Sequence, residues 1–219
     1  MEAFQKLLSQ YTTRRFTAGE MVLYQGEVPE AVFVVKSGYV KMYNISSDGD
    51  EKPISFHGKN DILSSSWVFG KAQSALFFYE AHTACELYAV PRSEFRQALA
   101  AEPALQAYML DRYVSANTAK ALRLYGLQYS RAADKLLHMM FYLSQIHGRT
   151  LPYGNVLIEI PLTQQDLANF LGLTRETTGM ELLKIKKRGL ITQSKRHYRI
   201  DIKRLQETIG ETDFDSSAL

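Results

Sequence analysis

Arg175 and Glu176 are adjacent residues of opposite charge that directly follow Thr174, a residue that can begin a helix. An arginine can donate two hydrogen bonds to O6 and N7 of a guanine, and a glutamate can accept one from N4 of a cytosine. In a helix that starts here, Met180 and Lys184 follow Glu176 on the same face, one turn apart. Side chains of this kind near the start of a helix have the chemistry for reading base edges in the major groove of DNA.

The residues before this row predict a second helix that would hold it in place. Thr163 and Asp166 have the spacing of a capping box, which predicts a helix over 164–171. Gly172 predicts the end of that helix, because glycine adopts the left-handed conformation that closes many helices. Two helices joined by so short a turn indicate a helix-turn-helix.

The second helix, over about 175–187, has Thr174 as its predicted N-cap. Its inner face is predicted to carry three residues at helical spacing, Thr178, Leu182 and Ile185. Because a plain pair of antiparallel helices with a solvated basic face has the same pattern, DNA binding needs support from outside these two helices.

The residues after the second helix give that support. The segments 190–192 and 197–200 read as two short strands around a turn over 193–196 that contains the basic Lys195 and Arg196, which is the pattern of a wing. Basic side chains at such a turn can contact phosphates, which position a protein on DNA without reading its sequence. The predicted DNA-contacting residues are Thr163, Thr174, Arg175, Glu176, Gly179, Met180, Lys184, Lys195 and Arg196.

The charge is unevenly distributed along the chain. Residues 1–130 hold 13 Lys/Arg and 13 Asp/Glu, whereas residues 131–206 hold 13 and 6, a net charge of +7. The acidic tail 207–219 has a net charge of −4. A basic C-terminal domain supplies the salt-dependent part of an affinity for double-stranded DNA.

The first hundred residues have a different pattern. Short runs rich in β-branched and aromatic residues, such as 31–35, 39–43 and 85–90, alternate with glycines at turn positions. This spacing predicts an all-β roll over residues 1–102. With a helix over 103–129 and a winged helix-turn-helix domain over 130–206, the predicted fold class is α+β.

The predicted helix 103–129 carries a stripe at three- and four-residue intervals that is wide enough for a helix of a second copy. The residues of this predicted dimer interface are Leu110, Val114, Asn117, Ala121 and Leu124. Asn117 could fix the register of the dimer, face a ligand, or be a tolerated polar residue.

The amino-acid composition narrows the class of protein further. With 46% hydrophobic and 22% charged residues, no long apolar run and no signal-peptide pattern, the chain is expected to be cytoplasmic, with no membrane contact. The one cysteine, Cys85, lies in an apolar run and is interpreted as a buried small hydrophobe. The five histidines form no HxH or HxxxH pair. A cupin-like metalloenzyme is therefore a weak alternative, and neither a metal, a cofactor nor enzyme activity is predicted.

The order of parts and several motifs resemble the CRP/FNR family of bacterial transcription regulators. The motifs are Phe16-Thr17-Ala18-Gly19-Glu20, Val34-Val35-Lys36-Ser37-Gly38, Thr83-Ala84-Cys85-Glu86-Leu87 and, most specifically, Thr174-Arg175-Glu176-Thr177-Thr178-Gly179. The resemblance implies a homodimer on a palindromic DNA site, with RNA polymerase as a further partner. The family often has a second arginine where this chain has Met180, whose thioether could rest against a thymine methyl.

The resemblance fails at the motif that holds a cyclic nucleotide. Members that bind cAMP carry an arginine for the cyclic phosphate, but no arginine lies between Lys59 and Arg92. The same region is rich in aromatic residues that could line a pocket for a small organic effector or simply fill the core. The predicted pocket is Trp67, Phe69, Phe78, Tyr79, Tyr113 and Asn117. Haem held by His57 or His82, and a protein that is active without any ligand, are the alternatives.

Overall fold

A computed structural model of the chain describes residues 1–210, so most of the predicted acidic tail, 211–219, lies outside the described residues. The chain forms two compact units, Met1–Asp111 and Arg112–Leu219. The division falls inside a long helix, α4 (Pro103–Leu127), and the first turns of that helix belong to the first unit.

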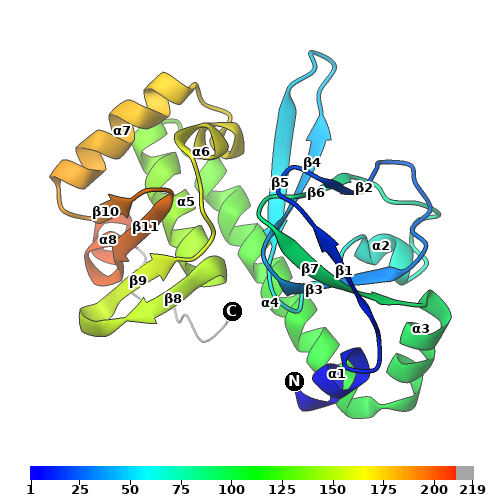
Figure 1. Cartoon of the computed structure of the whole chain (residues 1–219). Coiled ribbons are helices and arrows are strands. Elements are labelled where there is room, and N and C mark those ends of the chain that lie inside the picture. Colours follow the sequence, from blue (N-terminus) through cyan, green and yellow to red (C-terminus); the bar gives the residue numbers. More distant parts are fainter. Residues whose placement is uncertain (211–219) are drawn as a thin grey trace. The chain divides into compact units, whose positions relative to one another are not determined.

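The first unit contains two antiparallel sheets (Figure 1). One has the order β1-β7-β3, and its strands are β1 (Thr13–Phe16), β7 (Cys85–Val90) and β3 (Val32–Ser37). The other has the order β2-β6-β4-β5, with β2 (Met21–Leu23), β6 (Phe78–Ala81), β4 (Val40–Ile45) and β5 (Glu51–His57). The expected strands over 31–35, 39–43 and 85–90 are confirmed, and so is the β-roll.

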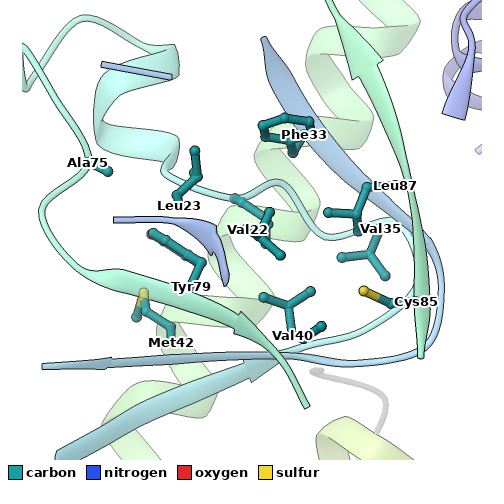
Figure 2. Close-up of a cluster of buried hydrophobic side chains, with 12 residues drawn as sticks. Val22, Leu23, Phe33, Val35, Val40, Met42, Ala75, Tyr79, Cys85 and Leu87 are labelled. Atoms are coloured by element: carbon teal, nitrogen blue, oxygen red, sulfur yellow. The ribbon is translucent and has the colours of Figure 1, made fainter. Parts of the chain in front are cut away.

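The two sheets enclose an apolar cluster (Figure 2). Val35, Val40 and Leu87 are fully buried in it, as expected for the inward positions of β-branched and aliphatic strands. Gly38 makes the turn between β3 and β4, where φ is +79° and a Cβ would lie 2.3 Å from the carbonyl oxygen of Ala84. Only glycine fits this turn, because any other side chain would meet backbone.

Four helices complete the first unit: α1 (Glu2–Leu8), α2 (Ser65–Val68), α3 (Arg92–Ala101) and the beginning of α4. They enclose a second apolar cluster that includes Phe4, Trp67, Phe95, Leu105 and Met109. The expected start of α4 at Pro103 is confirmed, and proline at the first position of this helix loses no hydrogen bond there.

The second unit is built around α5 (Ala132–His147), which is buried along most of its length. Its N-cap is Arg131, with no side-chain cap hydrogen bond. The end of α4 lies close against α5, because a Cβ at Gly126 would lie 2.7 Å from Cβ of His138.

A four-stranded antiparallel sheet packs against α5, in the order β10-β11-β9-β8. Its strands are β10 (Ile191–Ser194), β11 (His197–Asp201), β9 (Asn155–Ile158) and β8 (Gly148–Leu151), with a short 3-10 turn, η1 (Pro152–Gly154), between the last two. Besides the rest of α4, the helices of this unit are α5, α6 (Gln164–Leu171), α7 (Arg175–Lys187) and α8 (Ile202–Ile209). Within residues 1–210, no helix is both long and apolar enough to cross a membrane.

Candidate nucleic-acid interface

The first helix of the predicted motif begins as expected. The Thr163 hydroxyl accepts a hydrogen bond from the Asp166 backbone N–H (3.0 Å), and the Asp166 carboxylate accepts one from the Thr163 N–H (2.7 Å). This reciprocal pair is a complete capping box. Gly172 ends α6 in the left-handed conformation, with φ of +66°. Because the Thr163 hydroxyl is engaged in the cap, its contact with DNA stays a prediction.

The second helix is fixed by its own cap and by its buried face. The Thr174 hydroxyl accepts from the Thr177 N–H at 3.1 Å, and Thr178, Leu182 and Ile185 are buried. The buried Thr178 hydroxyl donates to the Thr174 carbonyl at 2.9 Å, so no polar group is left unsatisfied there. These contacts confirm the expected inner face of α7.

Gly179 lies where α6 and α7 approach one another. A Cβ at this position would lie 3.1 Å from Oε1 of Gln164 at the start of α6. A side chain at this position would therefore require the end of the Gln164 side chain to shift by a few tenths of an ångström. The predicted contact of Gly179 with DNA stays a prediction.

The opposite face of α7 carries the residues expected to read bases. Arg175 and Glu176 are exposed, and within residues 1–210 neither forms an ion pair or a side-chain hydrogen bond. Met180 is 58% exposed. Lys184, by contrast, already holds Glu181 at 2.6 Å. The first turns of α7 thus present free hydrogen-bonding groups and an apolar side chain.

The predicted wing is a tight hairpin, in which Ser194 of β10 pairs with His197 of β11. Lys195 and Arg196 form the turn and are exposed. Lys195 has φ of +54°, a conformation that residues other than glycine rarely adopt. The structure therefore places both basic residues at the tip, and their contact with phosphate remains a prediction.

Contacts that sequence reasoning missed hold this strained turn. The Gln193 side-chain amide donates to the Lys195 carbonyl at 2.8 Å and accepts from Nζ of Lys186 on α7 at 2.5 Å. The Arg196 carbonyl accepts from the N–H of Leu162, just before α6, at 2.8 Å. We call the chain Lys186–Gln193–Lys195 the wing latch, because it ties the turn to α7. No sequence motif marks it, since it depends on the fold.

A second missed contact joins α4 to α6. The guanidinium of Arg123 donates to the Phe170 carbonyl at 3.3 Å and lies 4.4 Å from the centre of the Phe170 ring. The carbonyls at the end of a helix carry partial negative charge, so a cation is favoured there. Burial lowers the pKa of Arg123, but the group remains charged because its ordinary pKa is so high.

The stripe predicted for dimerisation lies on the free side of α4. Leu110, Val114 and Leu124 are 67%, 56% and 63% exposed, and Asn117 and Ala121 are exposed as well. The opposite face of the helix holds the buried Ala119 and Gly126. An apolar stripe left open on one copy is the surface expected of a helix that pairs with a second copy.

The structure does not bring the predicted effector residues of the first unit into one pocket. Trp67 belongs to the cluster beneath the helices, with Phe69 packed against it, whereas Tyr79 belongs to the cluster between the sheets (Figure 2). Phe78 stacks on Tyr43, with 5.4 Å between ring centres. The remaining two residues, Tyr113 and Asn117, lie on α4 in the second unit. The core interpretation of these aromatics thus accounts for Trp67 and Tyr79.

The two histidines considered for haem are packed against aromatic rings. The His57 ring lies 5.8 Å from that of Tyr79, and the His82 ring 4.8 Å from that of Phe56. In the part of the chain that the structure describes, no three His, Cys, Asp or Glu residues gather as metal ligands would. Cys85 is buried, and burial raises the pKa of its thiol to about 11, as expected for an unreactive cysteine.

These features define a winged helix-turn-helix protein with an N-terminal β-roll. Residues 13–102 match the family model of the cyclic nucleotide-binding domain, and residues 130–208 match that of the Crp-like helix-turn-helix domain. The chain therefore belongs to the CRP/FNR family of DNA-binding transcription regulators. The first match identifies the type of domain. That this domain lacks the residues that hold a cyclic nucleotide stays a prediction.

Individual relatives agree with this assignment. The chain is 26% identical to the cAMP-activated global transcriptional regulator CRP of Escherichia coli O6:H1, over 84% of this chain and 87% of that protein. It is 26% identical to the nitrogen fixation regulation protein FixK of Rhizobium meliloti, over 80% and 76%. The fold is similar to that of FixK2 from Bradyrhizobium japonicum, with a TM-score of 0.73, 20% identity and coverage of 90% and 96%.

Proposed function

We propose that this transcription regulator is a homodimer that binds a palindromic DNA site, with one α7 in the major groove of each half-site. The observation that carries this proposal is the first turn of α7, where Arg175 and Glu176 are exposed and have no ion pair with any residue of 1–210, on a helix whose opposite face is buried. The open stripe on α4 supports a dimer, and the charge of +7 over residues 131–206 supports binding to DNA. Contact with RNA polymerase is proposed from family resemblance alone.

Selection from a pool of random duplexes tests the proposal directly. The full chain is expected to enrich a two-fold symmetric sequence with the half-sites about one helical turn apart. Arg175→Ala should relax the preference for guanine at one position of each half-site, at a cost of about 1–3 kcal/mol. Arg199→Ala, on an exposed residue of β11, is the matched control and should leave that preference intact. A pool that yields no shared sequence would contradict the proposal.

We further propose that the roll responds to an effector other than a cyclic nucleotide. The cyclic phosphate of such a ligand needs a cation in a partly dry pocket. Lys41 is held by Glu51 at 2.6 Å and Glu80 at 3.3 Å. Arg92 lies 4.6 Å from the centre of the Trp67 ring and donates to the Val68 carbonyl. Both cations are engaged by the protein itself. Adding cAMP or cGMP should therefore leave the DNA affinity unchanged, and a rise in affinity would refute this proposal.

A roll that is locked in the active state without any ligand is the second candidate. The burial of Trp67 and Tyr79, which are 5% and 4% exposed, favours it because these rings fill the core. Comparing DNA affinity before and after denaturation, extraction of small molecules and refolding separates the two cases. Equal affinities support the ligand-free roll, whereas a loss that is restored by the extract supports an effector.

A further inference from the structure

The outward face of α7 is a straight stripe of four residues, Glu176, Met180, Leu183 and Lys187, at intervals of four, three and four. Such residues lie above one another along a helix. The buried stripe of Thr178, Leu182 and Ile185 lies on the other side of α7. The outward stripe therefore faces away from the body of its own unit.

The middle of this stripe is apolar. Met180 is 58% exposed and Leu183 is 55% exposed, and as residues three apart on a helix they are neighbours. Covering these two side chains with a partner is favourable, because it removes apolar surface from water. We call Met180 and Leu183 together the apolar pair.

We propose that the apolar pair reads DNA sequence by contacting the C5 methyl groups of thymines in the major groove. Thymine is the only base that presents a methyl group there, and apolar side chains are the groups that contact it. The inference rests on the proposed function, because it requires α7 to lie in the groove. It adds Leu183 to the residues that determine which sequence is bound.

The spacing of the stripe agrees with this assignment. A helix rises about 1.5 Å per residue, so Met180 lies about 6 Å beyond Glu176, and Leu183 about 4.5 Å beyond Met180. Stacked base pairs are about 3.4 Å apart. Met180 and Leu183 can therefore contact two neighbouring base pairs. These lie further along the half-site than the base pair that Glu176 reads.

The surrounding charges favour DNA over an apolar protein as the occupant. Lys187 continues the stripe beyond Leu183, and Arg175 lies at its beginning. Lys184 is held by Glu181 at 2.6 Å, and Glu181 lies on the flank of the helix remote from Leu183. The apolar pair is thus set among basic residues that suit phosphates, while one neighbouring cation, Lys184, is held by Glu181.

The experiment removes single methyl groups from the DNA. A site selected by the wild-type chain is synthesised with uracil in place of each thymine in turn, which deletes only the C5 methyl. The affinity is expected to fall about fourfold at one or two adjacent positions per half-site, the equivalent of one buried methyl group. Uracil at the other positions should have no effect.

Substitutions assign the effect to the apolar pair. Met180→Gln and Leu183→Gln keep a long side chain and a good helix former but remove the apolar contact, so the variant that carries both should bind thymine and uracil sites equally. Lys187→Gln is the matched control on the same stripe and should retain the discrimination. Circular dichroism checks that each of these variants is folded, as expected for exposed positions.

The outcomes of these experiments distinguish a failure of this inference from a failure of the proposed function. A wild-type chain that binds its selected site but is indifferent to uracil everywhere overturns this inference and leaves the proposed function standing. Discrimination that persists in the double variant assigns the methyl contact to another residue and also overturns it. A chain that selects no sequence at all refutes the proposed function itself.

Discussion

Tyr198 on β11 shows what a single residue contributes to the DNA-binding unit. Its side chain is fully buried, and its hydroxyl is without a hydrogen-bond partner in the part of the chain that is described. Burial, and then the negative charge of Asp166 in the cap of α6, raise the pKa of Tyr198 to about 12. An unsatisfied buried hydroxyl costs stability, because it has lost its bonds with water.

Tyr198→Phe is therefore expected to raise the free energy of unfolding by about 1 kcal/mol, because it removes a buried polar group without changing the shape of the ring. The folded-state pKa of Tyr198 lies above the unfolded value of 10.0. Because the folded state keeps this proton to a higher pH than the unfolded chain, the titration of Tyr198 leaves stability unchanged below pH 10 and lowers it as the pH rises from about 10 to 12. Denaturant unfolding, followed by circular dichroism, gives the free energy of unfolding at pH 8 and pH 11. Between these two pH values the variant should lose less of this free energy than the wild type.

Tyr153→Phe is the matched control for this measurement. Tyr153 is 97% exposed, so removing its hydroxyl should change neither the stability at pH 8 nor the loss at pH 11. A Tyr198→Phe variant that is less stable than the wild type at pH 8 would show that the hydroxyl has a partner in solution, such as a bound water molecule.

Residues with local roles could be predicted, and residues with tertiary roles could not. The caps at Thr163 and Thr174 depend on neighbours three residues away, so the sequence contains the whole interaction. Arg123 contacts Phe170, which is 47 residues distant, and no local pattern near either residue predicts this contact. Leu183 could have been predicted from the sequence, because it follows Met180 by one turn on the outward stripe of α7.

At the scale of elements, the wing latch determines how firmly the wing is held. Gln193→Ala removes both side-chain hydrogen bonds, and the strained Lys195 turn is then free to relax. We expect the affinity for specific and random duplexes to fall alike, by about 1 kcal/mol, because the wing is predicted to contact phosphates only. Fluorescence anisotropy with both kinds of duplex measures this change.

A double-mutant cycle separates the latch from a general loss of stability. In a chain that already carries Lys195→Ala and Arg196→Ala, Gln193→Ala should have no further effect, because there is no longer a basic tip to position. Thr192→Ala, an exposed neighbour on β10, should leave binding unchanged in either background. Additive losses would instead mean that Gln193 acts on DNA independently of the wing tip.

Elements with strong periodic patterns were predicted well, and short elements without such patterns were not. The helices α6 and α7 and the wing strands follow from caps, helical spacing and alternation. The strands β8 and β9 went unpredicted, since each has four residues, and most of these are exposed in β8 and partly exposed in β9. They are strands because β9 pairs with β11, which follows it by about 40 residues. Such pairing is decided by the fold and not by local sequence.

At the scale of the whole molecule, the charge distribution and the order of the domains could be predicted from the sequence. Which side chains meet inside the roll could not. The aromatic residues between 67 and 82 form one run in the sequence, which suggested one pocket. Alternating directions along β6 send Tyr79 into the sheet cluster and Phe78 to the opposite face, while Trp67 joins the helix cluster. Proximity in the sequence was therefore a poor guide to which rings meet.

The last prediction concerns assembly, because two recognition helices can reach a palindrome only when a dimer holds them about 34 Å apart. Ala121→Glu would place two unpaired carboxylates at the proposed pairing of α4 helices, and burying unpaired charges is strongly unfavourable. We expect the variant to be monomeric by light scattering and to lose binding to a palindrome while keeping weak, salt-dependent binding to random duplexes.

Ala116→Glu is the matched control, since it makes the same change at an exposed position of α4 outside the stripe and should leave the dimer intact. The pair of variants thus holds helix propensity and charge constant and changes only the face of the helix. If both variants remain dimers, α4 is not the interface, and the open stripe of Leu110, Val114 and Leu124 would need another partner to cover it. If both become monomers, the added charge and not its position breaks the dimer, and the interface cannot be assigned to this stripe.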